Sequence, residues 1–459
     1  MIRIFAPTGC VGFGFSDVSF EAGMRAQPDV IGIDAGSSDP GPSYLGSGEC
    51  FIARDAVERD LDRILPAAKK MGVPVLIGTA GGAGGNPHVD WALEIVRDIA
   101  RARHLRLKVA VIRSEIPKES LHAAYREGRI SPLPAAPAFD ESVIDNATRV
   151  VGMMGLEAFQ AALREGVDLV LAGRACDASI FAAAPVSRGV PRGLALHAAK
   201  IIQCGNGAVE HRIIPDGMLG YLTKEDFVLT PLLAGTRCTP DSVISHSLYE
   251  NPDAYLTPEP AGVLDASSAW YRQEPDEVSV RVGGSIFHHS DAYTVRLEAA
   301  ELAGYRSLVF GAIRDTVLLR QLDAFCEAFK LKWKRRIAET FPDERGEDHS
   351  QPTHILTLRL YGVNAAMGAR EPNTFNGHEA GLMIEAVART QERAHTLVTI
   401  GQNLIFHAPV QGWSGQVSNI AFPYSPSVLD GGAVYRFSMN HVMRLDDPCE
   451  PFPIEIVEL

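Results

Sequence analysis

The chain has 459 residues, a net charge of −13 at pH 7 and a hydrophobic content of 46%. This length predicts two or three domains, and the hydrophobic content excludes a disordered chain. An acidic chain is a poor partner for nucleic acid or anionic membranes, so we expect neither. The seven cysteines are scattered and form no metal-like pairs, which predicts reduced thiols in the cytoplasm.

Short apolar runs alternate with helical patterns over the first 210 residues. Strands are predicted at Ile2–Phe5, Val30–Ile33, Val73–Ile77, Lys108–Ile112 and Asp168–Leu171. Helices are predicted between and after them, at residues 17–26, 56–71, 155–165, 178–184 and 193–203, with two more beginning near Pro87 and Pro117. This alternation predicts an α/β fold with a doubly wound, mostly parallel, Rossmann-like sheet, and we assign residues 1–210 to a ligand-binding domain.

The pattern changes beyond residue 210. Residues 211–290 are predicted to form an irregular connecting region, because they hold several Pro and Asx turns. Residues 291–459 are predicted to form a C-terminal α/β sandwich domain. Its strands are expected at Ala292–Leu297, Leu308–Ala312, His354–Tyr361, Ala380–Ala388 and Val434–Met443, and its helices at residues 317–341 and 390–406.

Four of the N-terminal strands end in loops rich in glycine and polar residues. The loops beyond the carboxyl ends of parallel strands gather at one edge of the sheet, where ligands bind. The long loop at residues 34–47 supplies carboxyl, phenol and hydroxyl groups. We predict acid–base roles for Asp34, Asp39 and Tyr44 and substrate contacts for Ser37 and Ser38.

The loop Gly78–Pro87 is the most glycine-rich segment at this edge. Such a loop can bring backbone N–H groups close to a phosphate or carboxylate. It lacks the Lys-Ser/Thr of a Walker loop, so nucleotide hydrolysis is not expected. The alternative is a flexible turn. The residues predicted to contact substrate are Thr79, Gly81, Gly82, Gly84 and Asn86.

Charged groups follow the strand that ends near Leu171. Arg174 could clamp a substrate carboxylate, or it could belong to a structural ion pair. Asp177 could accept a proton or cap the next helix. Cys176 has no histidine close in sequence, so a buried inert thiol is expected. Lys224 is a further candidate for substrate contact, its alternative being a solvated side chain.

The glycine loop after the first strand allows a dinucleotide alternative. Gly9, Gly12 and Gly14 follow a strand and precede a helix, and Asp34 lies about twenty residues on, as in dinucleotide-binding folds. Their spacing departs from the usual fingerprint, so the alternative is a turn that shapes the pocket floor. We assign no cofactor. We also expect no metal site, because adjacent His288 and His289 would point to opposite faces of a strand.

Several motifs occur in an order typical of one family. They are the early glycine loop, Gly78–Pro87, Gly173–Ser179, Gly220–Phe227 and Glu259–Asp265. In this order, over roughly residues 1–440, they resemble the acyclic terpene utilisation AtuA-like family. The resemblance implies a cytosolic bacterial protein in the catabolism of branched or acyclic carboxylic acids and their CoA thioesters. It also implies a separate small partner protein, and it transfers no catalytic residue.

These observations favour an enzyme that acts on a carboxylate or acyl-CoA by acid–base chemistry next to a carbonyl, as a hydratase, lyase or isomerase. One alternative is an NAD(P)-dependent oxidoreductase that uses the first glycine loop. Another is a non-catalytic scaffold or ligand-sensing subunit that works with the small partner. A homo-oligomer is expected, because the C-terminal strands leave edges to cover.

Overall fold

The computed structural model describes residues 1–248, 251, 253–342, 353–412 and 420–459. The chain has a mixed α/β fold and divides into two compact units. The first comprises Met1–Glu301 and Phe437–Leu459, and the second comprises Leu302–Arg436. No helix in the described part of the chain combines the length and apolar character that crossing a bilayer requires.

The first unit is built on a large mixed sheet. Its parallel strands lie in the order β1 (Ile2–Ala6), β2 (Val30–Asp34), β3 (Val75–Gly78), β7 (Leu169–Ala172) and β4 (Lys108–Ile112). Antiparallel strands extend it, namely β8 (Met218–Leu222), β9 (Asp226–Pro231), β13 (Val280–Gly283) and β12 (Trp270–Gln273) beyond β1, and β20 (Ile454–Glu458) beyond β4. Because β7 lies between β3 and β4, the loops that follow β3 and β7 are neighbours.

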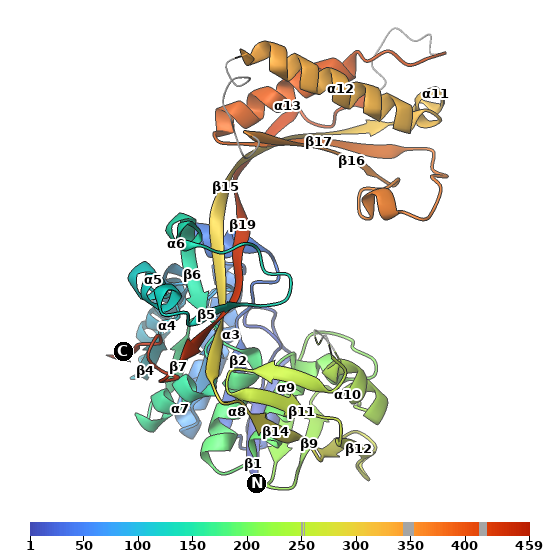
Figure 1. The fold of residues 1–459 in the computed structure, drawn as a ribbon. Coiled ribbons are helices and arrows are strands. Elements are labelled where there is room, and N and C mark those ends of the chain that lie inside the picture. The colour runs from blue at the N-terminus through green and yellow to red at the C-terminus, as the bar shows by residue number, and fades with distance from the viewer. Residues whose placement is uncertain (249–250, 252, 343–352, 413–419) are drawn as a thin grey trace. The chain divides into compact units, whose positions relative to one another are not determined.

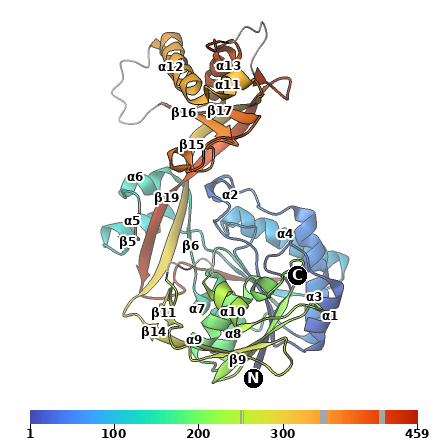
Figure 2. The ribbon, with the colours of Figure 1, turned by 90° about the vertical axis from the view of Figure 1, so that its right-hand side faces the viewer.

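Helices pack on both faces of this sheet (Figure 2). Successive residues of a strand point to opposite faces, so Leu76 belongs to one core and Val75 and Ile77 to the other. The first core includes α7 (Leu156–Arg164), α8 (Asp177–Ser187) and α9 (Arg192–Ile202). The second includes α1 (Asp17–Arg25), α3 (Arg54–Met71) and α4 (Asn86–Ala102). Burial on both faces explains why the parallel strands are continuous apolar runs.

Smaller elements complete the first unit. They are α2 (Pro42–Ser47), α5 (Lys118–Arg126), β5 (Ile130–Pro132), α6 (Glu141–Asn146), β6 (Ala147–Gly152), η1 (Gly205–Ala208), α10 (Pro240–Ser247), and a three-stranded sheet of β10 (Leu256–Glu259), β11 (Gly262–Asp265) and β14 (Ile286–His289). The sequence predicts an irregular connecting region at residues 211–290, whereas the structure places a series of short strands, among them β8, β9 and β13, and the helix α10 within this range. These strands form because they pair with other strands, as β8 does with β1 and β9. A local sequence rich in turn residues gives no sign of such pairing.

The second unit is a sheet with helices on one face (Figure 1). Its elements are the residues of β15 (Tyr293–Ile313) and β19 (Val428–Leu445) that fall within 302–436, with β16 (His354–Tyr361), β17 (Ala380–Ala388), β18 (Ile420–Ala421), α11 (Thr316–Leu319), α12 (Leu322–Thr340), η3 (Gly368–Arg370) and α13 (Gln391–Phe406). Trp333 of α12 is buried and donates a hydrogen bond from Nε1 to the Leu397 carbonyl of α13, 2.8 Å away. The two strands predicted within residues 292–312 are one continuous strand, β15.

Candidate functional site

The loops beyond the parallel strands of the first unit are joined to one another by main-chain hydrogen bonds. The Ala35 N–H donates to the Gly78 carbonyl over 3.0 Å, and the Thr79 N–H donates to the Gly173 carbonyl over 2.9 Å. The Gly173 N–H in turn donates to the Ile112 carbonyl over 2.9 Å. These bonds connect the carboxyl ends of β2, β3, β7 and β4, so the loops form one continuous rim along this edge of the sheet.

Two glycines allow the loops to touch. A Cβ on Gly36 would lie only 2.6 Å from Cα of Gly82, and a Cβ on Gly84 would collide with the backbone nitrogen of Arg174. Both glycines also have a positive φ, 137° for Gly36 and 71° for Gly84, which disfavours other residues. Glycine at these positions therefore serves close loop packing as well as turn geometry.

Arg174 is at the centre of this rim and is 5% exposed. Its Nε donates to Glu298 Oε2 over 2.9 Å and its Nη2 donates to Glu298 Oε1 over 3.3 Å. The Asp177 carboxylate is 3.6 Å from Nη1. Burial lowers the pKa of Arg174, but the charges of Glu298 and Asp177 outweigh this effect and hold that pKa above its usual value. Burial likewise disfavours the charge of Glu298, yet Arg174 holds the pKa of Glu298 below its usual value. The guanidinium therefore already has a bidentate carboxylate partner within the protein.

Asp34 and Asp177 form a carboxylate pair beside Arg174. Burial and then the charge of Asp177 raise the pKa of Asp34 well above its ordinary value, and Arg174 only partly offsets this. Asp177 is the first residue of α8, and Asp34 is the last residue of β2. A carboxyl group whose pKa is raised by burial and by a neighbouring carboxylate holds its proton more tightly than usual and can serve as a general acid.

A thiol and a carboxyl group meet at the same rim. Cys176, the N-cap of α8, donates from Sγ to Oε2 of Glu259 over 3.1 Å. Burial raises the pKa of Glu259 to about 7, and the hydrogen bond from Cys176 opposes this rise. Burial, Glu259 and Asp177 all raise the pKa of the Cys176 thiol. The thiol therefore stays protonated at neutral pH, while Glu259 titrates there.

A second hydrogen-bonded group lies next to this pair. Tyr293 donates from its hydroxyl to Glu157 Oε2 over 2.7 Å, and Arg192 Nη2 donates to Glu157 Oε1 over 2.6 Å. Burial and then the charge of Glu157 raise the pKa of Tyr293. Glu157 is thus satisfied by two donors and fixes both side chains.

The residues predicted in the 34–47 loop take different positions. Ser38 hydrogen-bonds to Glu298, which connects this loop to Arg174. Ser37 donates to Asp39 Oδ2 over 2.7 Å in an exposed local turn. Tyr44 lies on α2, with its ring edge-on to Phe51 at 5.4 Å between centroids. Among these residues, Asp34 and Ser38 lie at the Arg174 cluster, whereas Ser37 and Asp39 bond to each other.

Backbone amides of the 78–87 loop mostly donate within the protein. The amides that do so are those of Thr79, Ala80, Gly82, Gly84 and Asn86. The Thr79 hydroxyl also accepts from the Ala175 N–H over 3.3 Å and from Arg174 Nη1 over 3.4 Å. The loop therefore offers fewer amides to an anion than its composition implies.

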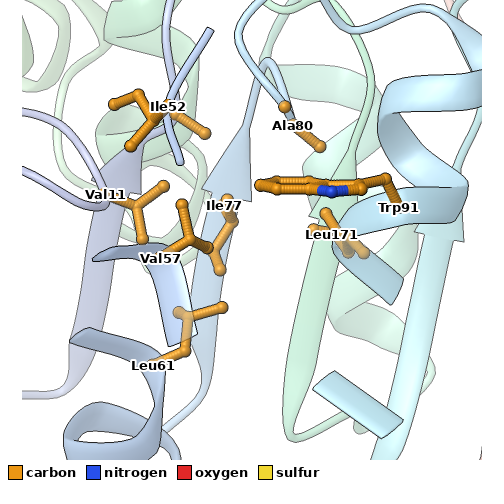
Figure 3. Close-up of a pocket in the computed structure, with 11 residues that line it drawn as sticks. Val11, Ile52, Val57, Leu61, Ile77, Ala80, Trp91 and Leu171 are labelled. Atoms are coloured by element: carbon orange, nitrogen blue, oxygen red, sulfur yellow. The ribbon is translucent and has the colours of Figure 1, made fainter. Parts of the chain in front are cut away.

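A small apolar cavity lies beneath this loop (Figure 3). It is lined by Ala80 and Gly81 of the loop, by Ile77 and Leu171 of the sheet, and by Trp91 of α4, among others. Figure 3 shows the Trp91 indole extending between Ala80 and Leu171. Its volume of about 10 Å³ suffices for no more than a water molecule, so it is a packing defect and not a substrate pocket.

The first glycine loop is occupied by the protein's own carboxylate. The N–H groups of Gly12 and Gly14 both donate to Asp60 Oδ2, over 2.7 and 3.0 Å. A Cβ on Gly9 would lie 2.8 Å from the Cys204 carbonyl, so this glycine permits close backbone packing. Because Asp60 takes the place that a pyrophosphate would need, these contacts do not favour the dinucleotide alternative.

Lys224 is not brought to this rim. It is exposed in the turn between β8 and β9. Leu222, just before this turn, pairs with Ile2 at the amino end of β1. The turn therefore lies at the edge of the sheet opposite to the loops that follow the parallel strands.

Residues 53–206 match the family model of acyclic terpene utilisation family protein AtuA. The resemblance to this family is confirmed over that segment. No curated protein and no solved structure matches the chain. The AtuA match includes the 78–87 loop, Arg174, Cys176 and Asp177, whereas Glu259 and Glu298 lie outside it.

Sequence reasoning missed the two glutamates that complete the rim. Glu259 lies in the Glu259–Asp265 stretch that contributes to the family resemblance, so a signal was present, but nothing in its spacing indicates Cys176 as its partner. Glu298 is a carboxylate within the apolar part of β15 and is buried. An isolated charge in an apolar strand indicates a distant partner of opposite charge.

Proposed function

We propose that the protein acts in acyclic terpene utilisation as a catabolic enzyme that moves a proton next to the carbonyl of a carboxylate or acyl-CoA substrate. Hydratase, lyase and isomerase reactions share this step. The AtuA family match supports the pathway context. In this proposal the parallel strands of the first unit serve as a Rossmann-like ligand-binding core, with the chemistry at the carboxyl ends of β2 and β7.

The observation that carries the proposal is the contact of 3.1 Å between Cys176 Sγ and Glu259 Oε2. A general acid–base group works best when its pKa lies near the working pH, and the pKa of Glu259 is raised to about 7. Ionised Glu259 would take the proton from the carbon next to the carbonyl. The Cys176 thiol would hold that carboxylate in place by its hydrogen bond.

Asp34 is the proposed partner acid. Its raised pKa favours the protonated form, so it can deliver a proton to a departing hydroxyl or to the second carbon of an isomerised product. In an isomerisation the proton taken by Glu259 is returned to the substrate. In a dehydration the substrate hydroxyl leaves as water with the proton of Asp34, and Glu259 holds the proton taken from carbon. After the product leaves, Glu259 loses this proton and Asp34 gains one, which restores both groups.

Exchange of substrate protons with solvent tests this proposal. The protein is incubated in D2O with a panel of branched carboxylates and their CoA thioesters, and deuterium next to the carbonyl is measured by mass spectrometry. We expect exchange with at least one compound, and a loss of roughly 100-fold or more in Glu259→Gln. Glu225→Gln in the exposed β8–β9 turn is the matched control. Exchange at the wild-type rate in Glu259→Gln, or none with any compound, would contradict the proposal.

A further inference from the structure

A polar pocket of about 150 Å³ lies where α4 and α5 begin. Asn86, the first residue of α4, and Lys118, the first residue of α5, both line it. Glu115 and Arg149 supply further charge, and Ile116 and Val150 supply apolar wall. None of these residues belongs to the Cys176–Glu259 or Arg174–Glu298 contacts, so the pocket is a separate feature of the first unit.

Positive charge prevails among the residues that line this pocket. Arg149 donates from Nη1 to the carbonyls of Leu45 and Gly46, over 3.2 and 2.6 Å. Lys118 donates from Nζ to the Asp145 carbonyl over 2.6 Å. These acceptors are uncharged, so they orient the two cations without neutralising them.

The only carboxylate in the lining already has hydrogen-bond and charge partners in the protein. Glu115 Oε2 accepts from the Asn86 N–H over 2.9 Å and lies 3.9 Å from Arg149 Nε. It thereby caps the first turn of α4 and offsets one of the two cations. One positive charge is left over, which a monovalent anion would balance.

Asn86 has polar capacity that the protein does not use. Its side-chain Oδ1 is buried, and no group among the described residues hydrogen-bonds to it. A buried polar atom without a partner destabilises the fold, because it has lost its hydrogen bonds to water and gained none. A rotation of the carboxamide would let the same side chain donate from its NH2 group to a ligand oxygen.

We propose that this pocket binds a small free carboxylate, with its anionic end at Arg149 and Lys118 and its hydrocarbon part against Ile116 and Val150. A cavity of this size accepts a molecule of roughly six heavy atoms, which corresponds to a short, branched or linear acid. A CoA thioester has no charge at its acyl end and would not satisfy the two cations. The proposal does not depend on the catalytic role of Glu259, because no lining residue is shared.

Direct binding measurements test it. Saturation-transfer NMR and calorimetric titration would compare butanoate and 3-methylbutanoate with their uncharged amides. We expect the acids to bind at least ~10-fold more tightly than the amides, since only the acids carry charge. Arg149→Gln and Lys118→Gln should each weaken acid binding ~5-fold or more. Lys70→Gln, an exposed lysine of α3 outside the pocket, is the control and should bind as the wild type does.

The variants separate the possible outcomes. Arg149 also holds α2 through its hydrogen bonds to carbonyls of that helix, so the folding of each variant is checked by thermal unfolding. Where Arg149→Gln is misfolded, the binding result of Lys118→Gln alone decides the test. Glu259→Gln is expected to bind the acids normally, which keeps this result distinct from the proton-exchange test. Three results would overturn the proposal. They are equal binding of acids and amides, no binding of the acids at 50 mM (~2 kcal/mol of affinity), and unchanged acid binding in Lys118→Gln.

Discussion

The guanidinium of Arg174 and the carboxylate of Glu298 form a buried, bidentate ion pair between the rim after β7 and strand β15. The Nε–Oε2 distance is 2.9 Å, and both side chains are 5% exposed. The pair joins segments that are 124 residues apart in the sequence. A variant of Arg174 that loses substrate binding would therefore not by itself identify a substrate contact, because the same change leaves Glu298 buried without its partner.

Removal of one member of this pair is expected to destabilise the fold strongly. Glu298→Ala leaves a buried guanidinium without its bidentate partner, although Asp177 and Asp34 remain near it. Such losses amount to about 3–5 kcal/mol. Urea unfolding followed by circular dichroism measures this change. The control is Glu141→Ala, which breaks the exposed pair with Arg126 and should have little effect. Equal stability of the two variants would contradict the structural role of the Arg174–Glu298 pair.

The close packing of the rim predicts a contrast between two glycines. Gly84→Ala places a methyl group against the Arg174 backbone, whereas Gly189→Ala, with a φ of 84°, meets nothing within 4 Å. Both changes strain a positive φ, which costs about 1–2 kcal/mol. In urea unfolding, Gly84→Ala should therefore lower the free energy of unfolding clearly more than Gly189→Ala does. The difference between the two losses measures the contact between the loops. If the two variants were equally stable, the loops would not be packed as described.

The carboxyl group of Glu259 should make stability depend on pH. Its pKa is raised from 4.5 to about 7, so the folded protein holds this proton more tightly than the unfolded chain does. The stabilisation is fully present below about pH 4.5 and is lost as the pH rises through about 7. Between pH 4.5 and 8, the wild type should therefore lose about 2–3 kcal/mol relative to Glu259→Gln. Parallel stability curves for the two proteins would show that Glu259 titrates normally.

Ser114 is expected to hold the rim together. Its hydroxyl donates to the Gly84 carbonyl over 2.8 Å and accepts from the Arg174 N–H over 2.7 Å, and the residue is fully buried. Ser114→Ala leaves a buried donor and a buried acceptor unpaired, at a cost of about 2–4 kcal/mol. Thermal unfolding should show a lower Tm than for Ser120→Ala, an exposed serine on α5. A Tm equal to that of the Ser120 variant would count against this role.

Much of the fold could be predicted because its regular elements have strong local signals. Strands β4, β16 and β17 have the predicted bounds. Each is a run rich in apolar residues that ends where the strand pattern of the sequence ends. Strand β15 was predicted as two strands. Glu298 and Glu301 interrupt its apolar pattern, and the buried charge at Glu298 is accounted for only by Arg174, which lies far away in the sequence.

The candidate site could be predicted in part for the same reason. Asp34 ends β2, and Arg174 and Asp177 follow β7. Parallel strands bring their carboxyl ends to one edge of the sheet whatever their order in it. Glu259 arrives there from β10, a short strand whose place is fixed by pairing with β11. The sequence contains no sign of that pairing, so the contact with Cys176 became evident only from the fold.

Strand β20 has a consequence for how the protein is made. It completes the sheet next to β4, with Ile454 opposite Ile112, and it follows residues 302–436 in the chain. At ribosomal speeds, β4 would wait roughly 20–70 s for this neighbour. Its outer hydrogen-bonding groups have no strand to pair with during that interval, and an unpaired edge attracts other chains. Translation that stalls before β20 would thus release a nascent chain prone to aggregate.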